Sequence, residues 1–308
     1  MTTTEVRCRE QILQAAALLT ARELIERTWG NISARVSETQ MIITPSGLGY
    51  DTLREDQLVL VDLSDGSYTG TIKPSSERGI HADAYRLRPE VNFVIHTHQY
   101  WASIVGTSGA ALTGFRHPLL GKRVPCAAYG LPGTKRLRRA VEAEISAWPD
   151  CRAFLMRSHG ALCLGRDIED AFAAAQALEE VSQERVLDLT GPVEAPPALL
   201  QLGVSQRQGE SFWLEANDTR QLYPIQGGIL PPAAALHAAV YRAGPFQFAA
   251  YEAAEEVRAV SGWGQTLRPY MDDLAQIAGI DLRCVPAEPP AVERALRRRN
   301  AVLLRGTG

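Results

Sequence analysis

The stretch at 73–98 constrains this chain more than any other, because it holds three of the six histidines, His81, His96 and His98. Residues 91–95 read Val-Asn-Phe-Val-Ile, a short and partly β-branched run that favours a buried strand over a helix. His96 and His98 stand at the carboxyl end of this run. Alternate residues of a strand point to the same face, so both imidazoles can reach one divalent ion. The stretch therefore predicts two ligands of a metal site at a strand end.

A third ligand must come from elsewhere, because a catalytic zinc usually has three protein ligands and an open position. His159 follows the apolar run Ala-Phe-Leu-Met at 153–156 and precedes a glycine, so it also stands near the end of a predicted strand. We predict one divalent ion per chain on His96, His98 and His159. Imidazole ligands favour Zn²⁺, with Fe²⁺, Mn²⁺ or Co²⁺ as alternatives. The competing interpretation is three packed core histidines.

The amino-acid composition limits the size of the domains, the binding partners and the cellular location that can be expected. With 308 residues, 45% hydrophobic and 22% charged, the chain can form one large or two smaller globular domains. A net charge of −3 gives no reason to expect nucleic acid or an anionic membrane as partner. No apolar run approaches the ~20 residues of a membrane span, and the polar N-terminus resembles no secretion signal. The five cysteines show no Cys-x-x-Cys pattern. We expect a cytoplasmic protein with reduced thiols.

The remaining pattern alternates short strands with helices, which favours a layered α/β domain. Ser75 and Ser76 are predicted to cap a helix over 77–86, with Glu77 in its first turn. The other predicted elements are helices at 10–26, 100–105, 137–148 and 167–189 and strands at 40–44 and 58–61.

Five motifs occur in an order and spacing that resemble the class II aldolase/adducin family over residues 5–190. They are Thr-Trp-Gly-Asn-Ile-Ser at 28–33, Ile-Thr-Pro-Ser-Gly at 43–47, Lys-Pro-Ser-Ser-Glu at 73–77, His-Thr-His at 96–98 and Ser-His-Gly at 158–160. The resemblance implies a three-layer α/β/α fold with a mainly antiparallel central sheet, assembled as a cyclic tetramer. The family contains aldolases, an epimerase, decarboxylases, a dehydratase and non-catalytic adducins, so membership alone does not fix the reaction.

The resemblance also implies roles for side chains. Glu77 would coordinate the ion at rest and move a proton when substrate binds, whereas the alternative is a helix-capping glutamate. His117 lies near the place of a catalytic tyrosine in fuculose-phosphate aldolases, and a histidine can also transfer a proton. The terminal phosphate of the substrate would lie among short polar groups at a helix N-terminus. The candidates for phosphate binding are Asn31, Ser46, Gly47, Ser75 and Ser76, with Ser33 as a further one.

Residues beyond the Pro-rich connector at 192–197 suggest a second copy of part of the same fold. The segment at 80–89 recurs at 236–245, and the segment at 152–160 recurs at 300–308. We predict a catalytic domain over 1–195 and, over 196–308, a linker and a partial, degenerate copy without metal ligands. The alternative is chance similarity between helix N-termini and buried strands. The alignment leaves the first ~70 residues of the copy missing.

This alignment places other residue types where the first copy has its site residues. The equivalents of Glu77, His96, His98 and His159 would be Ala233, Glu252, Ala254 and Thr307. Two chains, each carrying one intact and one decayed copy, would close a pseudo-tetramer, and the alternative is a tetramer of catalytic domains.

The expected function is a metal-dependent lyase that cleaves a C–C bond of a small phosphorylated ketose or hydroxy-carbonyl compound. The metal would polarise the carbonyl and stabilise an enediolate, while Glu77 moves the proton. One alternative is a decarboxylase or dehydratase of the same fold. The other is an adducin-like interaction protein, which the intact histidine set disfavours.

Overall fold

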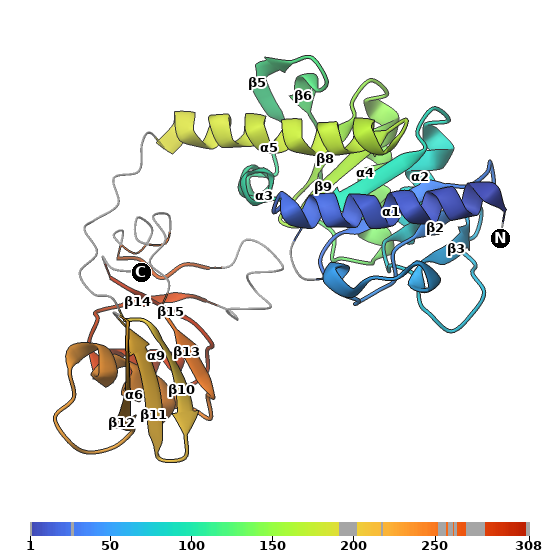
Figure 1. The fold of residues 1–308 in the computed structure, drawn as a ribbon. Coiled ribbons are helices and arrows are strands. Elements are labelled where there is room, and N and C mark those ends of the chain that lie inside the picture. The colour runs from blue at the N-terminus through green and yellow to red at the C-terminus, as the bar shows by residue number, and fades with distance from the viewer. Residues whose placement is uncertain are drawn as a thin grey trace. The chain divides into compact units, whose positions relative to one another are not determined.

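The computed structural model describes residues 2–25, 28–190, 202–216, 218–251, 257, 261, 264–268 and 281–305. The chain divides into two compact units, Met1–Leu189 and Thr190–Gly308, and each is described by itself (Figure 1). The connector expected over 192–197 lies outside the described residues. Within the described ranges, no helix combines the length and apolar character that crossing a bilayer requires.

A seven-stranded sheet in the order β3-β2-β1-β4-β9-β8-β7 forms the centre of the N-terminal unit. Neighbouring strands are antiparallel except for the pair β7 and β8, so the predicted mainly antiparallel sheet is confirmed. A separate hairpin is formed by β5 (Leu112–His117) and β6 (Gly121–Val124). The strands of the large sheet are β1 (Asn31–Arg35), β2 (Gln40–Ile43), β3 (Val59–Asp62), β4 (Phe93–Thr97), β7 (Cys126–Ala127), β8 (Ala153–Met156) and β9 (Gly160–Gly165).

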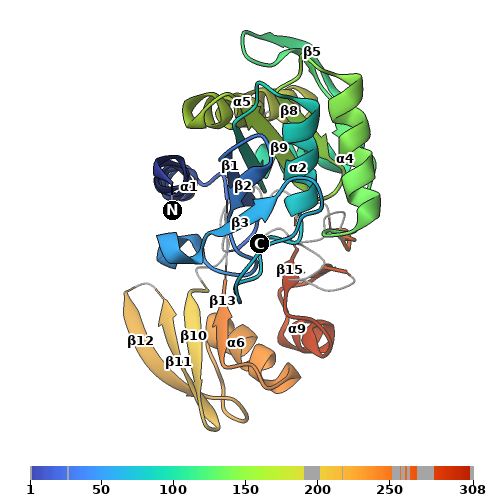
Figure 2. The same cartoon turned by 90° about the vertical axis from the view of Figure 1, so that its right-hand side faces the viewer.

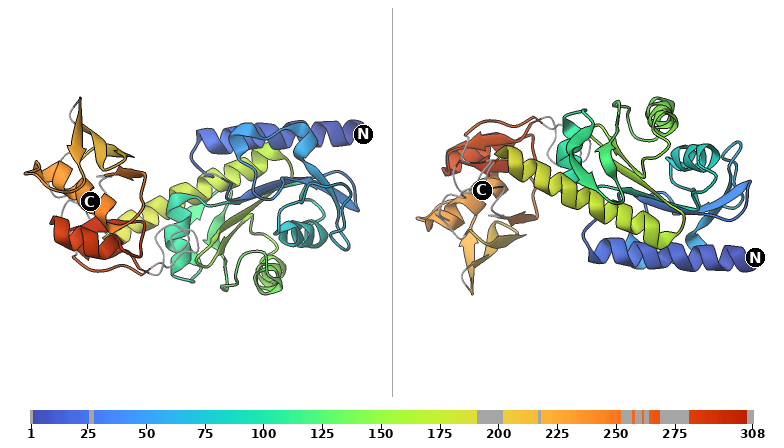
Figure 3. Two further views of the ribbon diagram at one scale, coloured as in Figure 1. Left: turned by 90° about the horizontal axis from the view of Figure 1, so that it is seen from below. Right: turned by 90° about the horizontal axis from the view of Figure 1, so that it is seen from above.

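Helices cover both faces of this sheet, which gives the predicted three layers (Figure 2). One face packs against α1 (Thr3–Ala21), α3 (Tyr100–Thr107) and α5 (Ile168–Thr190). The other face packs against α2 (Arg78–Leu87) and α4 (Lys135–Ala147). Figure 3 shows α1 and α5 on the same side of the sheet from two further directions. Two short 3₁₀ helices, Tyr50–Thr52 and Glu55–Gln57, connect β2 to β3.

Strand alternation explains how one sheet supplies two cores. On β4, Phe93 and Ile95 join the core under α1 and α5, while Val94 joins the core under α2 and α4. Successive side chains of a strand point to opposite faces, so His96 continues on the face of Val94. The α2/α4 face of the sheet therefore carries the histidines.

Two differences from the predicted helix starts have a clear structural cause. The first helix begins at Thr3 instead of residue 10, because Thr2 and Glu5 form a reciprocal capping box that satisfies early backbone N–H groups. The helix predicted over 77–86 begins at Arg78, with Glu77 as its N-cap residue. The Glu77 side chain makes no capping hydrogen bond, since its carboxylate faces the histidines.

The C-terminal unit has a four-stranded antiparallel sheet in the order β12-β11-β10-β13 and a separate parallel pair, β14 and β15. Among the described residues, α6 and α9 pack on these strands and close two small apolar cores. The elements are β10 (Val204–Gln208), β11 (Ser211–Ala216), β12 (Thr219–Pro224), α6 (Pro232–Ala243), β13 (Phe248–Ala250), β14 (Arg283–Val285), α9 (Pro289–Leu296) and β15 (Val302–Leu304).

Candidate active site

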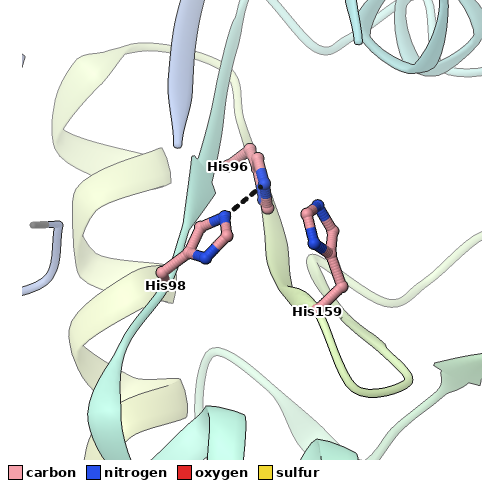
Figure 4. Close-up of side chains that lie close together, drawn as sticks. All are labelled: His96, His98 and His159. Atoms are coloured by element: carbon pink, nitrogen blue, oxygen red, sulfur yellow. Dashed lines mark hydrogen bonds between the residues drawn. The ribbon is translucent and has the colours of Figure 1, made fainter. Parts of the chain in front are cut away.

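His96 is fixed by the middle of the large sheet. Strand β4 lies between β1 and β9, and the ring is 1% exposed. Its Nδ1 lies 2.8 Å from the carbonyl oxygen of Ala161 on β9. A carbonyl can only accept, so Nδ1 carries the proton and the lone pair of Nε2 faces the site. The Nε2 of His98, which follows β4, lies 3.0 Å from the Nε2 of His96 (Figure 4).

His159 reaches the same point from the turn between β8 and β9. Its ring centroid lies 4.9 Å from that of His96 and 4.9 Å from that of His98, and Figure 4 shows the three rings facing one space. One nitrogen of each ring can be chosen so that all lie within 4.8 Å of one another. Two nitrogen ligands of a tetrahedral zinc at ~2.0–2.1 Å stand about 3.3 Å apart. The donor set fits a divalent ion after a small adjustment.

Two glycines allow the backbone to pass close to the histidines. A Cβ at Gly160 would overlap the Thr97 carbonyl oxygen and come within 3.0 Å of His96 Cε1. Gly30 has φ +93°, and a Cβ there would lie 2.6 Å from the His96 carbonyl oxygen. Side chains at either position would displace β4 or the β8–β9 turn, which positions His159.

Glu77 completes the cluster from the start of α2. It is 6% exposed, with Oε1 3.0 Å from His159 Nε2 and Oε2 3.2 Å from His96 Nε2. The Asn31 amide donates a hydrogen bond to Oε2 at 3.0 Å. The carboxylate thus lies against two of the predicted metal ligands and is held by a third group.

The charge states at the site follow from burial and contacts. Burial alone would raise the pKa of Glu77, but the His96 and His159 imidazoles and the Asn31 amide hold it well below its ordinary value. Burial lowers the pKa of His96 well below its ordinary value. Glu77 is therefore ionised and His96 neutral at pH 7, which are the forms in which these side chains bind a metal.

A buried network of hydrogen bonds connects Asn31, the partner of Glu77, to three further side chains. The His81 Nε2–H donates to Asn31 Oδ1 at 2.5 Å, and Ser33 Oγ lies 2.6 Å from His81 Nδ1 and 2.8 Å from the Tyr85 hydroxyl. Burial lowers the pKa of His81 to about 4, so the ring is neutral and its Nδ1 accepts from Ser33. This network fixes the orientation of the Asn31 side-chain amide, which in turn donates a hydrogen bond to Glu77.

Sequence reasoning did not identify His81 and Tyr85 as members of this hydrogen-bond network. A signal was present, because Glu77, His81 and Tyr85 are spaced i, i+4 and i+8 on one helix face. Asn31 was predicted to bind phosphate. In the structure its side-chain amide accepts a hydrogen bond from His81 and donates one to Glu77.

The other candidates for phosphate binding lie on two adjoining loops. A β-bridge joins Pro45 to Pro74, and the Ser75 N–H donates to the Thr44 carbonyl at 3.0 Å. The Ser75 hydroxyl is buried and accepts a hydrogen bond from the Glu77 N–H at 3.2 Å. Exposed positions on the two loops are Ser46, Gly47 and Ser76. Ser76 and Glu77 line a cavity of about 240 Å³ that also contacts Arg78 and Lys135.

His117 ends β5 in the separate hairpin and is half-buried. Its Nδ1 accepts a hydrogen bond from the Leu119 N–H of the same hairpin at 3.2 Å. The three-histidine group does not include it, and its proposed catalytic role stays a prediction.

A carboxylate from α5 fixes the chain immediately after His98. Glu179 accepts hydrogen bonds from the N–H groups of Trp101 and Ala102 at 2.8 and 3.0 Å. It thereby caps α3, whose N–H groups would otherwise lack partners. The Gln99 side chain donates to the Ala175 carbonyl at 2.8 Å. Together these contacts anchor the carboxyl end of the His-x-His segment to α5.

Residues 10–186 match the model of the class II aldolase and adducin N-terminal domain. The chain belongs to the class II aldolase and adducin family. The match spans the whole seven-stranded sheet, most of the helices that cover it and every predicted site residue.

Relatives within this family carry aldolase names. The 5-methylthioribulose-1-phosphate/5-deoxyribulose-1-phosphate aldolase of Rhodospirillum rubrum is 32% identical over 193 residues, which cover 61% of this chain and 85% of that protein. The L-fuculose phosphate aldolase of Escherichia coli is 30% identical over 188 residues, covering 59% and 85%. A solved structure of an L-fuculose 1-phosphate aldolase superposes with a TM-score of 0.54 at 26% identity, covering 64% of this chain and 92% of that one. They confirm the predicted fold and an aldolase-type enzyme.

Proposed function

We propose that the N-terminal unit is a metal-dependent lyase that cleaves a C–C bond of a small phosphorylated ketose. The observation that carries this proposal is the convergence of three histidines on a buried, ionised Glu77. Two relatives named after ketose phosphates support the substrate class.

The metal would be held by His96, His98 and His159, with Glu77 close enough to join them. Three imidazoles and a carboxylate form a donor set that suits Zn²⁺. When bound, a divalent ion supplies Lewis-acid polarisation of the substrate carbonyl.

The chain's own groups supply the proton transfers. In a 2-ketose, retro-aldol cleavage breaks the bond between C3 and C4, removes the proton of the C4 hydroxyl and adds a proton at C3. Glu77 would exchange the proton at C3, and Asn31 holds its carboxylate in place. His117 would accept the proton of the C4 hydroxyl. Ser46, Gly47, Ser75 and Ser76 would bind the phosphate.

An activity assay tests this proposal. We expect zinc-loaded protein to convert a ketose 1-phosphate into a three-carbon ketone phosphate and an aldehyde, measured by enzyme-coupled reduction of the ketone phosphate. The same ketose without phosphate should be a much poorer substrate. Release of CO₂ from a phosphorylated keto acid, with no cleavage of any ketose phosphate, would instead identify a decarboxylase.

The metal ligands are tested by replacement. We expect His96→Ala combined with His159→Ala to abolish both metal content and turnover, because two of three nitrogen ligands are removed. The variant should still fold, since β4 and the strands β8 and β9 on either side of His159 are held by apolar cores on both faces. Metal retained at one ion per chain, measured by plasma mass spectrometry, would contradict the assignment.

The homo-oligomer implied by the family resemblance stays a prediction that light scattering can check.

A further inference from the structure

The two units share an order of elements. In the N-terminal unit, the antiparallel strands β1 to β3 precede α2 and β4, and β4 pairs with β1. In the C-terminal unit, the antiparallel strands β10 to β12 precede α6 and β13, and β13 pairs with β10. The strand orders β3-β2-β1-β4 and β12-β11-β10-β13 therefore correspond. Sequence alignment had left the first three strands of the copy missing.

A buried polar cluster recurs between a strand and a helix. Ser205 on β10 lies 2.7 Å from His237 Nδ1 and 2.7 Å from the Tyr241 hydroxyl, both on α6. Ser33 on β1 makes the same two contacts with the histidine and tyrosine of α2. In each helix the histidine and tyrosine are four residues apart. Equating the two serines therefore fixes which residues of the two sheets correspond.

The metal site does not recur in the described part of the C-terminal unit, where no second group of possible ligands was found. Ala233 stands four residues before His237, as Glu77 stands before His81. The other residues that alignment placed at site positions, Glu252, Ala254 and Thr307, lie outside the described residues. The described copy thus has the buried serine, histidine and tyrosine but no glutamate at the start of its helix.

Strand register identifies corresponding rows of side chains across the two sheets. In the first sheet, one row on β4, β1, β2 and β3 consists of Phe93, Ala34, Ile42 and Leu60. In the second sheet, the corresponding row on β13, β10, β11 and β12 consists of Phe248, Gln206, Trp213 and Leu222. The phenylalanine and the leucine at the two ends are the same in both rows.

The two rows differ in what covers them. The first row belongs to the core under α1 and α5, and Phe93 is 1% exposed. In the second row Phe248 is 69% exposed and Leu222 is 45% exposed, which is unusual for large apolar side chains. Figure 2 shows α6 on one side of β10 to β12, where Ser205 contacts it. The row lies on the opposite side, and neither apolar cluster of the C-terminal unit includes a residue of it.

The exposed side of this sheet, called the outer face below, is apolar and electrically neutral. Its two charged side chains, Glu215 and Arg220, pair with each other at 3.3 Å. The Trp213 Nε1–H donates to Gln208 Oε1 at 2.6 Å, so the polar atom of the indole has a partner. A nucleic acid or an anionic membrane would require several unpaired cations. The outer face consists of Val204, Gln206, Gln208, Ser211, Trp213, Glu215, Arg220, Leu222, Pro224, Phe248 and Ala250.

The size of the outer face favours one kind of partner. Four strands about 4.8 Å apart, with about 3.4 Å per residue, form a face of roughly 20 Å by 20 Å. A stable dimer buries about 800 Å² on each partner, so two such faces are too small to hold two copies together by themselves. One α-helix is about 10–12 Å across and fits on such a face. In the N-terminal unit α1 packs on β1 and β2 in this way.

We propose that the C-terminal unit repeats part of the N-terminal fold and that its outer face binds an amphipathic α-helix of another polypeptide, in the place that α1 has on the first sheet. The chemistry of the partner follows from α1. The buried residues of α1 are Cys8, Ile12, Ala15, Ala16 and Leu19, which lie along one side of the helix. The partner helix would therefore carry small and aliphatic side chains at this spacing, with no charge among them.

The test uses the full chain and a fluorescent peptide with the sequence of residues 2–21, which includes α1, carrying Cys8→Ala to prevent disulfide formation. We expect saturable binding by fluorescence anisotropy. The matched control peptide adds Ile12→Asp and Leu19→Asp, which place charges on the apolar side, and should bind at least tenfold more weakly. The unlabelled peptide has no tryptophan, so it should shift the protein emission to shorter wavelength, and Trp213→Phe should abolish this shift.

Three protein variants locate the binding face. Phe248→Asp and Leu222→Asp change exposed residues at opposite ends of the row, and each should weaken peptide binding at least tenfold without lowering the melting temperature. The matched control is Ile229→Asp, which changes a fully exposed residue in the loop between β12 and α6 and should leave binding unchanged.

Several results would overturn the proposal. They are the absence of saturable binding below about 1 mM peptide, equal binding of the two peptides, and equal effects of Phe248→Asp and Ile229→Asp. Light scattering examines the competing occupant, a second copy of this chain. We expect the same mass for the wild type and Phe248→Asp, and a smaller mass for Phe248→Asp would show that a second copy covers the outer face instead of a partner helix.

Discussion

Glu77 occupies a position where helix capping and catalysis are both chemically reasonable, and its contacts separate the two roles. A capping carboxylate would accept hydrogen bonds from the first N–H groups of α2. The Glu77 carboxylate instead contacts His96, His159 and Asn31. The first turn of α2 therefore lacks a Glu77 side-chain cap, which would contribute about 0.5–2 kcal/mol to stability. Such a loss is expected where a residue belongs to a functional site.

Replacing Glu77 by glutamine removes the ability to transfer a proton while keeping the shape of the side chain. We expect Glu77→Gln to retain metal and to lose about 10²–10⁴-fold in kcat, the usual contribution of a general acid–base residue. Steady-state assays with parallel metal analysis would measure both. The control is Glu142→Gln, which breaks a surface ion pair with Arg86 and should leave kcat unchanged. A wild-type rate in Glu77→Gln would reduce Glu77 to a structural residue.

His81 makes stability depend on pH. Burial lowers its pKa to about 4 in the folded protein from an ordinary value of 6.5, so between these values the unfolded chain binds a proton that the folded chain does not. Stability contributed by the neutral ring is therefore complete above pH 6.5 and is lost as pH falls towards 4. One unit of pKa shift corresponds to about 1.4 kcal/mol, which gives a loss of about 2 kcal/mol at pH 5.

Urea denaturation at pH 7 and pH 5, with chelator present throughout, checks this prediction. We expect His81→Gln to be less stable than wild type at pH 7, because contacts to Asn31 and Ser33 are lost, but to lose less stability between the two pH values. The control His117→Gln removes a histidine outside the buried network. An unchanged pH dependence in His81→Gln would show that other groups cause the loss.

At the scale of elements, the site depends on how closely β9 and the β8–β9 turn approach β4. The main-chain contact at Gly160 leaves no room for a Cβ beside the Thr97 carbonyl and the His96 ring. This explains why a turn carrying a metal ligand is followed directly by glycine. Glu179 acts at the same end of β4, where it ties the start of α3 to α5.

Gly160→Ala tests the importance of this approach. We expect a loss of about 1–3 kcal/mol in the free energy of unfolding, because the added methyl group forces the backbone to shift, and a weaker affinity for metal. Gly106→Ala is the matched control, since a Cβ at this helical position would meet Met156 at an ordinary 3.6 Å. That change should be neutral or stabilise by about 0.5–1 kcal/mol. Similar melting temperatures and metal affinities for the two variants would contradict the steric argument.

At the scale of the whole molecule, the two units have separate apolar cores. The two clusters of the large sheet contain only residues before Leu189, and the two smaller clusters contain only residues after Thr190. Every predicted metal ligand belongs to the first unit. Folding and metal binding of that unit therefore draw on its own core.

A fragment ending at Thr190 should fold and bind one metal ion per chain, because it keeps both large clusters and all three histidines. Circular dichroism and metal analysis would measure this, with the full chain as reference. An unfolded fragment, or one that binds no metal, would show that residues beyond 190 are needed for the site.

The sequence by itself determined the features that short windows encode. The i, i+2 spacing of His96 and His98 and the alternation of helices and strands depend on neighbours within a few residues. The capping box that starts α1 at Thr3 was also readable, but it was missed. The apolar run at 153–156 before His159 suggested the third ligand, and the family motifs added the role of Glu77.

Only the tertiary structure decided how distant residues meet. The Asn31–Glu77 and Asn31–His81 contacts join residues 46 and 50 positions apart, and they exist because β1 pairs with β4 under the start of α2. Strand register is also decided there: Ile95 of β4 pairs with Ile32 of β1 and with Cys163 of β9. The reason is physical: a one-residue shift hardly changes a local pattern, but it turns every side chain of a strand to the opposite face.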